Sequence, residues 1–489
     1  MSGKKPFRPK ARRPRGFEDK PAAILRAERR LIDAAVKIYD DWGFEPLQTP
    51  AFEYADALGK FLPDEERPNE GVFALEDDDG QWMALRYDLT APLARFAAEN
   101  FQDLAKPFRR YQFGDVWRNE KPGPGRFRQF VQCDADTVGA AGPAADAEMI
   151  ALAAEVMRGV GLKDGEYAVR VNDRRLLDGV LEMIGAEDPV TKGRILRAAD
   201  KLDRLGREGV AYLLGSGRKD ESGDFTEGAG LDAKGVDAVL AFLDATGGSR
   251  SEVVSRLDGI VGGSEKGAAG VAALGEIHAV LNALEIDESR AVFDPSIVRG
   301  LGYYTGPVFE AEILTAATYD DGKPIQFGSV GGGGRYDDLV SRFTGQAVPA
   351  TGYSFGVTRF ASVLAALGMG DAEEARPFAI VLNVEKDRVS DYLGIASELR
   401  AAGIRAEAFL GGGNMGKQLK YADRREADAA IIIGEDERES NTVTIKDLKL
   451  GARLARQISD NKEWREEQPA QKTVARQDLV AAIKAMVTK

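Results

Sequence analysis

A pair of strand-like stretches joined by a short loop is the feature that most restricts how this chain folds. Residues 112–118 and 126–136 flank the loop 119–125, which carries two prolines and two glycines. A connection this short joins antiparallel neighbours, so the pattern predicts a β-hairpin. Side chains two residues apart share one face of a strand. On the second strand that face carries Arg126, Arg128, Phe130, Gln132, Asp134 and Asp136.

This mixture of side chains on one strand face suits a nucleotide beside a small polar substrate. Arginine forks bind phosphates, and an aromatic ring stacks on a base. The glutamine and the aspartates that follow along the strand then hold the second substrate. The alternative interpretation is a solvated hairpin whose charges form salt bridges.

Two further segments combine chemically active residues with glycine. Residues 298–310 hold Arg299, Tyr303 and Tyr304 ahead of a strand, and the alternative for them is an ordinary aromatic strand edge. Residues 327–337 hold four consecutive glycines, which permit close approach of the backbone to a ligand. The run matches neither a dinucleotide-binding motif nor a P-loop, and its alternative interpretation is a flexible turn.

Helical and strand-like patterns divide the 489 residues into consecutive parts. A helix is predicted over 22–42, ending at Gly43, and helix patterns such as 190–205 indicate an inserted helical domain. After a charged linker at 373–377, strands and helices alternate, which indicates a small α/β domain with a largely parallel sheet. The predicted parts are a basic flexible tail (1–14), a core in two pieces (15–170 and 289–372), the helical insertion (171–288) and a C-terminal domain (376–489).

Composition excludes several classes of function. One cysteine, Cys133, and one histidine, His278, leave no disulfide framework, no zinc site built on cysteine and no cluster of histidine ligands. Strand alternation turns Cys133 toward packing, and His278 falls in a predicted helix with a structural or surface role. No apolar run approaches the ~20 residues of a membrane helix. The N-terminus lacks the apolar region of a secretory signal, and a cytoplasmic location is expected.

Charge restricts how the chain can meet nucleic acid. The net charge of −13 excludes general coating of nucleic acid but leaves room for local basic patches. Residues 1–15 carry seven Lys or Arg and no acid, and are interpreted either as a disordered tail or as an RNA contact. A second basic stripe, interpreted as an RNA contact or a solvated helix face, comprises Lys417, Lys420, Arg424 and Arg425.

From about residue 15 onward, the chain resembles the histidyl-tRNA synthetases, which are class II aminoacyl-tRNA synthetases. Residues 43–50 look like motif 1, the segment that ends in proline. Residues 117–130 look like motif 2, with its R-x-E, loop and R-x-x-x-F pattern. Residues 352–359 look like motif 3, which ends in arginine.

The signatures specific to the histidine family are the stronger part of this resemblance. RGLGYYTG at 299–306 and GGGGRYDDL at 331–339 are similar to its two signatures. LRYDLT at 85–90, QCDAD at 132–136 and VNDRRLLDG at 171–179 are similar to its eukaryote-like branch.

The resemblance implies an α+β fold: a class II antiparallel-sheet catalytic core, a helical insertion and a C-terminal α/β anticodon-binding domain. It implies activation of L-histidine with ATP to histidyl-adenylate plus pyrophosphate, then transfer of histidine to the 3′ end of tRNA(His). ATP is a substrate accompanied by Mg²⁺, and no resident metal or prosthetic group is expected. The resemblance does not favour Asp337 and Asp338 as a metal pair. It also implies a homodimer with no membrane partner.

The resemblance assigns roles to individual residues. At the phosphates it places the catalytic Arg118 and Arg299 on the α-phosphate and Arg126 on the γ-phosphate. At the adenine it places Glu120 near the amino group, with Phe130 and Arg359 on the two faces of the ring. Around the histidine it places residues for the α-amino group (Asp88, Thr90, Gln132), for the ring nitrogens (Asp136, Tyr304) and for the wall (Tyr303, Tyr336), with Arg299 beside them.

Four positions depart from the family pattern. An acid usually stands at Gly302, where it supports the loop, and a glutamate usually stands at Thr358, just before Arg359. Asp136 is one methylene shorter than the glutamate that many members carry. The motif 2 loop at 121–125 reads KPGPG, without the glutamine that many bacterial members use on the extra 5′ guanosine of tRNA(His). The acceptor end is therefore expected to be read differently.

Two alternative functions remain open from the sequence. One is a paralogue that regulates ATP phosphoribosyltransferase; such proteins lose the ATP and histidine signatures and usually lack the anticodon-binding domain, whereas this chain keeps both. The other is a histidine sensor without transfer activity, for which Gly302 and Thr358 leave room. Binding of histidine without release of pyrophosphate would identify the sensor.

Overall fold

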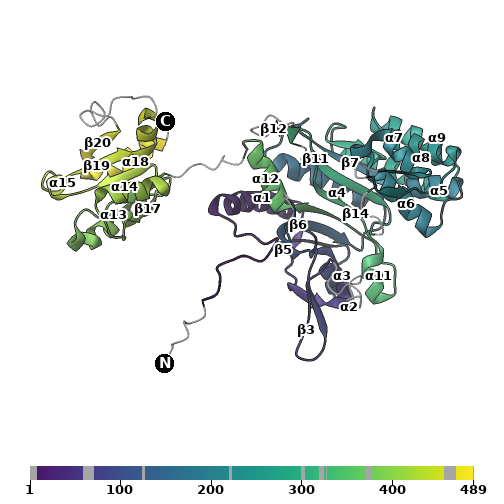
Figure 1. The fold of residues 1–489 in the computed structure, drawn as a ribbon, viewed down its shortest axis with the longest axis horizontal. Helices are drawn as coiled ribbons and strands as arrows, with labels where there is room; N and C mark the ends of the chain where they lie inside the picture. Colours follow the sequence, from purple (N-terminus) through teal and green to yellow (C-terminus); the bar gives the residue numbers. More distant parts are fainter. Residues whose placement is uncertain are drawn as a thin grey trace. The chain divides into compact units, whose positions relative to one another are not determined.

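The chain forms two compact units, Met1–Asp371 and Ala372–Lys489, each with its own main sheet (Figure 1). The computed structural model describes residues 8–58, 71–123, 127–219, 223–298, 303–315, 317–318, 324–325, 328–369, 377–455 and 470–487.

An eight-stranded sheet forms the centre of the first unit. Its strands are β1 (Glu45–Pro46), β5 (Phe108–Trp117), β6 (Gln129–Val138), β7 (Tyr167–Asp173), β10 (Ala291–Phe293), β11 (Pro307–Ile313), β14 (Ser329–Arg335) and β15 (Ala350–Gly356). In space they follow the order β1-β5-β6-β15-β14-β11-β7-β10. The six inner strands pair antiparallel, while β1 and β10 pair parallel at the two edges. The predicted hairpin is confirmed as β5–β6.

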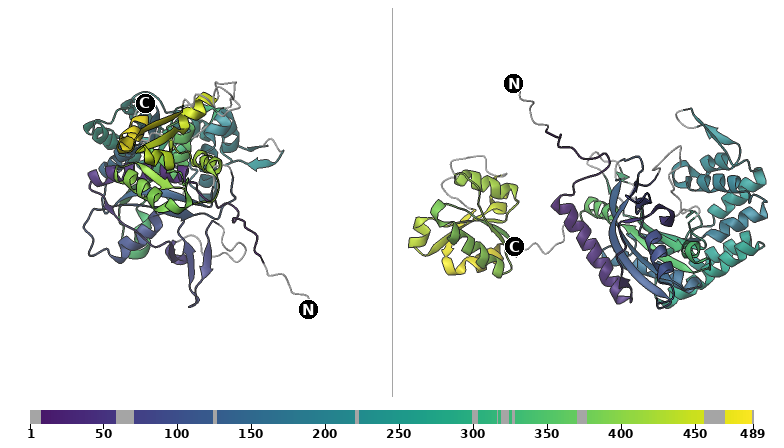
Figure 2. Two further views of the ribbon diagram at one scale, coloured as in Figure 1. Left: turned by 90° about the vertical axis from the view of Figure 1, so that its left-hand side faces the viewer. Right: turned by 90° about the horizontal axis from the view of Figure 1, so that it is seen from below.

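Helices cover one face of this sheet. Three of them, α1 (Ala22–Asp41), α4 (Pro143–Gly159) and α12 (Val357–Ala366), pack on one another and on its strands. Figure 2 shows from a second side that α1 lies along the sheet. As predicted, α1 ends just before Gly43, whose φ of +77° suits glycine. Cys133 of β6 is fully buried in the core beneath these helices, so its predicted packing role is confirmed.

Shorter elements complete the first unit. They are β2 (Phe52–Tyr54), α2 (Ala55–Leu58), β3 (Ala74–Glu76), β4 (Trp82–Leu85), α3 (Thr90–Glu99), β12 (Ala317–Thr318), β13 (Pro324–Ile325) and α11 (Asp338–Thr344). Helices α3 and α11 pack together around a separate apolar cluster, which includes Tyr336 and borders Tyr303 and Tyr304. This cluster fixes the position of the tyrosines that the sequence marks as a pocket wall.

A helical subdomain is inserted between β7 and β10. Its elements are α5 (Arg174–Met183), α6 (Pro189–Ala199), α7 (Leu202–Leu214), β8 (Gly217–Lys219), β9 (Phe225–Glu227), α8 (Ala233–Leu243), α9 (Arg250–Val261) and α10 (Glu265–Ala283). The single helix predicted over 190–205 is wrong. The chain breaks it between α6 and α7, where Lys201 N donates to Ala198 O instead of continuing the helical ladder. Both helices bury an apolar stripe. The helical spacing of apolar residues therefore continues from α6 into α7, and the sequence pattern does not show where one helix ends and the next begins.

The second unit has a five-stranded sheet in the order β17-β16-β18-β19-β20. Its elements are β16 (Phe378–Val381), η1 (Lys386–Arg388), α13 (Val389–Ala401), β17 (Arg405–Ala408), α14 (Met415–Arg424), β18 (Ala429–Ile432), α15 (Glu435–Glu439), β19 (Thr442–Asp447), α16 (Leu448–Ala455), β20 (Gln471–Ala475), η2 (Arg476–Asp478) and α18 (Leu479–Val487). Strands β17, β16 and β18 are parallel, but β19 and β20 add on antiparallel. The three strands predicted from the alternation are therefore confirmed as parallel, whereas the two strands that follow β18 make the whole sheet mixed rather than largely parallel.

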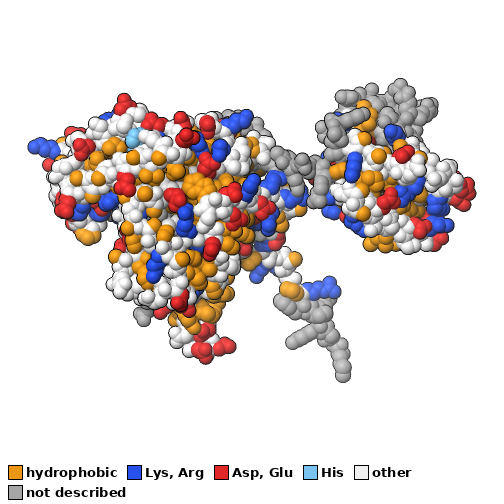
Figure 3. All heavy atoms as spheres, turned by 180° about the vertical axis from the view of Figure 1, so that it is seen from behind, with side chains coloured by type: hydrophobic (Ala, Val, Ile, Leu, Met, Phe, Trp, Pro, Cys, Tyr) orange, Lys and Arg blue, Asp and Glu red, His pale blue; other side chains and the backbone are white. Residues whose placement is uncertain are grey.

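The surface is mixed in charge. Figure 3 shows Lys and Arg interspersed with Asp and Glu over the face seen from behind. On α14, the predicted basic stripe keeps Lys417, Lys420 and Arg424 exposed, whereas Arg425 pairs with Glu407 at 3.2 Å. Among the described residues, none of the helices has the length and the hydropathy needed to span a membrane.

Candidate active site

A cavity of about 220 Å³ opens on the sheet face opposite to α1 and α4. Its floor comes from β6, β14 and β15, and its walls come from residues around the start of α3, beyond β5 and before β11. The lining residues are Asp88, Thr90, Arg118, Gln132, Asp134, Asp136, Tyr303, Tyr304, Gly332, Gly333, Tyr336, Gly352, Tyr353 and Ser354. The structure thus gathers in one cavity, together with Arg118, every residue predicted for histidine that lies within the described ranges.

A buried ion pair forms the deepest polar feature of the cavity. Arg110 Nη2 lies 2.9 Å from Asp136 Oδ2 and also donates to Leu89 O at 2.8 Å. The Tyr336 hydroxyl donates to Asp136 Oδ1. Burial raises the pKa of Asp136, while Arg110 and Tyr336 oppose that rise. Asp136 Oδ2 is itself buried and faces Arg110, so the ion pair holds the carboxylate in place beside the cavity.

Glycines beside the ion pair make room for it. A Cβ at Gly352 would stand 2.0 Å from Asp136 Oδ1, and a Cβ at Gly333 would stand 2.1 Å from Gly352 O. Gly331 is equally closed, because a Cβ there would meet the side chains of Phe355 and Tyr353 at 2.8 Å. The glycines at 331–334 belong to a central strand, β14, so the flexible-turn interpretation is wrong.

A second set of polar groups lies along the same strand face. Gln132 Nε2 donates to Ser354 Oγ at 2.8 Å, and Ser354 Oγ donates to Asp134 Oδ1 at 2.5 Å. Gln132 Oε1 and Asp134 Oδ2 are buried without a hydrogen-bond partner in the described part of the chain. Asp88 accepts from Ala91 N at 2.9 Å at the start of α3, and burial raises its pKa. Gln132 Oε1, an acceptor without a donor, suits a substrate ammonium group, which brings only donors.

Three tyrosines, Tyr303, Tyr304 and Tyr336, line one side of the cavity. The rings of Tyr303 and Tyr304 meet edge to face at 5.1 Å, and Tyr303 lies 5.8 Å from Tyr336. The hydroxyl groups of Tyr303 and Thr90 form a hydrogen bond. Burial raises the pKa of Tyr303, Tyr304 and Tyr336, so these phenols keep their protons and remain donors at neutral pH.

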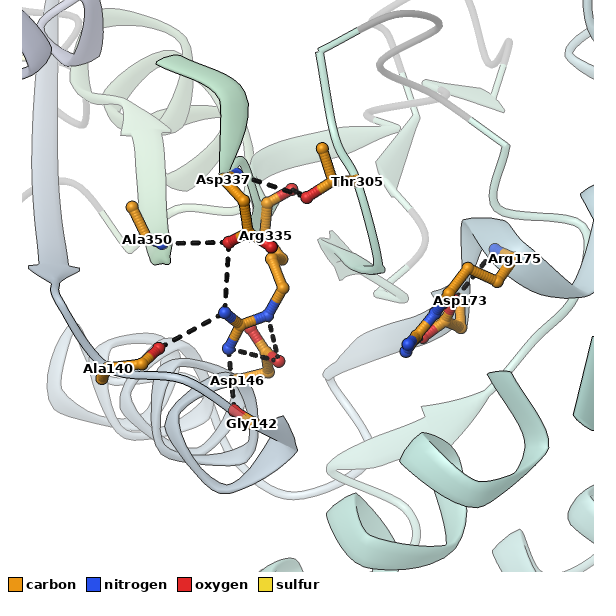
Figure 4. A network of polar contacts seen from close by, with 9 residues as sticks. All are labelled: Ala140, Gly142, Asp146, Asp173, Arg175, Thr305, Arg335, Asp337 and Ala350. Carbon is orange, nitrogen blue, oxygen red and sulfur yellow. Dashed lines mark hydrogen bonds and ion pairs between the residues drawn. The ribbon is translucent and has the colours of Figure 1, made fainter. Parts of the chain in front are cut away.

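The loop that carries these tyrosines is anchored by Arg335 (Figure 4). Arg335 Nε and Nη2 lie 2.9 Å from the Asp146 carboxylate, and Nη2 donates to Gly142 O at 2.7 Å. Its carbonyl accepts from Thr305 N at 2.8 Å, next to Tyr304. Asp337 N donates to Thr305 Oγ1 at 3.2 Å and Asp337 Oδ1 accepts from Ala350 N at 3.1 Å. Asp337 therefore links the side chain of Thr305 in this loop to the backbone of β15.

Residues predicted for ATP lie toward the other end of β6. Arg118 Nε donates to Tyr87 O at 3.2 Å, and its guanidinium lies 5.1 Å from the Phe130 ring centre. Phe130 is half-buried, while Glu120 and Arg359 are exposed and do not line the cavity. Arg126, Arg299 and Gly302 fall outside the described residues. Arg118 is thus the predicted ATP residue that also borders the histidine end.

Two protein-family models match the chain. The model described as "Histidyl-tRNA synthetase" covers residues 16–360, and the model described as "Anticodon binding domain" covers residues 378–486. The chain belongs to the histidyl-tRNA synthetase family. The resemblance drawn from the sequence and the fold class that it implies are confirmed.

Members of this family from several bacteria are similar over almost the whole chain. A histidine–tRNA ligase of Caulobacter vibrioides is 56% identical over 98% of this chain and 97% of its own length. One from Rhizobium leguminosarum bv. trifolii is 54% identical over 98% and 96%. A solved histidyl-tRNA synthetase from Nostoc covers 98% of this chain and 100% of its own, with a TM-score of 0.73 and 28% identity.

A further solved structure shares the fold alone. It is described as an ATP phosphoribosyltransferase regulatory subunit/histidyl-tRNA synthetase from Bacillus halodurans. It covers 85% of this chain and 97% of its own, with a TM-score of 0.64 and 23% identity. The fold alone therefore does not separate the synthetases from the regulatory alternative.

Sequence reasoning overlooked two residues of this site: Ser354, which lines the cavity, and Arg110, which pairs with Asp136. It placed Asp134 on the correct strand face and gave it only a general role toward the second substrate. The available signal was strand length: β5 and β6 have ten residues each, and their register sets Arg110 opposite Asp136. Extending the first predicted strand by two residues in phase with Gln112 would have found Arg110.

Asp134 leads to a prediction about pH. Burial first, and then the charge of Asp136, raises the pKa of Asp134 to about 8, far above the ~3.9 of an unfolded aspartate. Between these values the folded state holds a proton that the unfolded state has lost, so the free energy of unfolding decreases as pH rises toward 8. Asp134→Asn is expected to remove this dependence. Thermal unfolding of both proteins without ligands at pH 5, 7 and 9 tests it, and parallel pH profiles would contradict it.

Proposed function

We propose that this chain is a histidine–tRNA ligase that charges tRNA(His) with L-histidine in two ATP-dependent steps. The observation that carries the proposal is the cavity itself. It joins a buried carboxylate and protonated phenols at one end to Arg118 at the other, in a chain of the histidyl-tRNA synthetase family. The dimensions and donors of this cavity suit one histidine with its carboxylate directed toward ATP.

In the first step, the carboxylate of histidine attacks the α-phosphorus of ATP. A carboxyl oxygen–phosphorus bond forms, the bond to the β-phosphate oxygen breaks, and pyrophosphate leaves. The nucleophile is already an anion, so no side chain has to remove a proton. Negative charge grows on the α-phosphoryl oxygens, and Arg118, with Arg299 as its partner by family resemblance, stabilises that charge. Mg²⁺ enters with the phosphates of ATP.

Specificity comes from the two ring nitrogens of histidine. The Asp136 carboxylate accepts a hydrogen bond from one nitrogen, while the neutral phenol of Tyr304 donates to the other. Asp88, Thr90 and Gln132 hold the α-ammonium group. An amino acid without an imidazole would leave the buried Asp136 and Tyr304 without partners, which a site of this kind rejects strongly.

In the second step, a ribose hydroxyl at the 3′ end of tRNA(His) attacks the acyl carbon of the adenylate. An ester bond forms, the bond between the acyl carbon and the phosphate oxygen breaks, and AMP leaves while the hydroxyl proton passes to its phosphate or to water. Glu120, Phe130 and Arg359 hold the adenine, and Arg126 holds the γ-phosphate during activation. The C-terminal unit binds the anticodon region, with exposed Lys417, Lys420 and Arg424 as backbone contacts. The working form is a cytoplasmic homodimer.

Arg118→Ala is expected to lower kcat for histidine-dependent ATP–pyrophosphate exchange by about 10²-fold, the effect of removing one donor to a developing oxyanion. Since Arg118 also touches Phe130 and Tyr87, its unfolding midpoint is measured in parallel with that of the wild type. The exchange assay is the first measurement to make on the wild-type chain.

The outcomes of that assay separate the three functions. Exchange that depends on histidine and decreases in Arg118→Ala supports the ligase, and charging of tRNA(His) completes the test. Histidine binding without exchange would overturn the proposal in favour of the sensor. Stimulation of an ATP phosphoribosyltransferase without exchange would overturn it in favour of the regulatory paralogue.

A further inference from the structure

The segment before α1 contacts the start of the return strand of motif 2 and the aromatic ring of Phe73. We call residues 14–20 the N-terminal strap. Arg128 N donates to Gly16 O at 2.9 Å, and the rings of Phe17 and Phe73 lie 5.7 Å apart. Gly16 has a φ of +84°, and a Cβ there would meet the Arg128 side chain at 2.9 Å. The strap is therefore fitted closely against the return strand of motif 2.

At its other end, the strap joins a buried polar network. Lys20 Nζ donates to Glu28 Oε1 at 2.7 Å and to Oε2 at 3.0 Å, and the exposure of Glu28 is only 4%. Thr358 Oγ1 donates to Glu28 Oε1 at 2.6 Å and accepts from Lys20 Nζ at 3.2 Å. It also accepts from Val131 N at 3.1 Å. The hydroxyl thus uses its one donor and both acceptor positions.

This network lies between the two residues proposed to hold adenine. Thr358 precedes Arg359 in the first turn of α12, and Val131 follows Phe130 on β6. The Thr358–Val131 hydrogen bond therefore ties together the backbone segments that carry Arg359 and Phe130. The family usually has a glutamate at position 358; here a carboxylate still lies against this turn, but Glu28 supplies it from α1.

We propose that Lys20, Glu28 and Thr358 form a positioning network that sets the spacing of Phe130 and Arg359 for the adenine of ATP. The inference rests on the proposed function, since that function assigns the two residues to adenine. Four separate segments meet at the Thr358 hydroxyl: the strap, α1, β6 and α12. Removing one member frees α12 to shift on β6, and ATP binding has to restore the spacing.

The network is tested in the full-length chain by variants that keep side-chain shape. Thr358→Val and Glu28→Gln are each expected to raise KM for ATP in pyrophosphate exchange by about tenfold, the equivalent of one hydrogen bond. KM for histidine is expected to change less than about twofold, because Glu28 and Thr358 belong to helices on the covered face of the sheet, opposite to the histidine cavity. Thr358→Ser keeps the hydroxyl and is expected to behave like the wild type.

Arg29→Gln is the matched control for a lost charge on α1. Arg29 neighbours Glu28 but forms an exposed pair with Asp33 at 2.7 Å, outside the network. An unchanged KM for ATP in both Thr358→Val and Glu28→Gln would overturn the proposal. So would a parallel rise in KM for ATP and histidine together with a lower unfolding midpoint, because that marks a structural role only.

A direct binding measurement separates this inference from the proposed function. Titration calorimetry with ATP is carried out on the wild type and on both variants. If the wild type shows no exchange, the proposed function fails, yet weaker ATP binding in the variants still supports the network. Equal ATP affinity in all three proteins overturns the network whatever the exchange assay shows.

Discussion

Asp136→Asn is expected to lower kcat/KM for histidine in pyrophosphate exchange by about 10³-fold. The substitution replaces an acceptor for an imidazole N–H by an amide that offers one acceptor and two donors. It also removes the charge that pairs with Arg110 at 2.9 Å. Arg110 is fully buried, and its Nε and Nη1 have no other hydrogen-bond partner among the described residues. The variant therefore loses substrate recognition and leaves a cation unpaired beside the site.

The measurement compares kcat/KM for histidine with KM for ATP in the same variant. KM for ATP is expected to stay within about twofold of the wild type, because Asp136 lies at the far end of β6 from Phe130. Circular dichroism and an unfolding midpoint show that the variant is folded. A histidine kcat/KM within tenfold of the wild type would remove Asp136 from its assigned role.

The hairpin β5–β6 shows which features of the site can be predicted from the local sequence pattern. Alternation along a strand predicts that Gln132, Asp134 and Asp136 share a face, and the cavity contains all three. The same rule turns Cys133 into the core. These predictions succeed because the direction of a side chain on a strand follows from sequence position alone. Family resemblance then adds Asp88, Tyr303 and Tyr336 from distant segments, which alternation could not bring together.

Other features depend on contacts that no local pattern encodes. Glu28 reads as one polar position on an amphipathic helix, and Lys20 reads as part of a basic N-terminal region. Their pairing with Thr358 requires α1 and α12 to lie side by side, which is a property of the packed core. Likewise, the glycines at 331–334 form a strand because Phe309, Tyr353 and Phe355 occupy the space of their missing side chains. Local propensity alone disfavours glycine in that role.

Arg335→Met is expected to reduce the free energy of unfolding by about 3–5 kcal/mol, the cost of leaving one member of a buried ion pair without its partner. Arg335 and Asp146 are both buried, and the guanidinium also satisfies the carbonyls of Ala140 and Gly142 at the start of α4 (Figure 4). Urea unfolding of the full-length chain measures the effect. A change below about 1 kcal/mol would indicate that water replaces the guanidinium at little cost.

The effect of Arg335→Met is also expected to depend on pH, with a sign that follows from Asp146. Burial raises the pKa of Asp146 to about 6 even beside Arg335. Below that pH the carboxyl becomes neutral and needs no cation, so the loss of stability is expected to be smaller at pH 5 than at pH 8. The double variant Arg335→Met/Asp146→Leu removes both charges and is expected to regain most of the stability at pH 8. Equal losses at both pH values, or a double variant no more stable than Arg335→Met, would show that lost packing rather than an uncompensated carboxylate determines the effect.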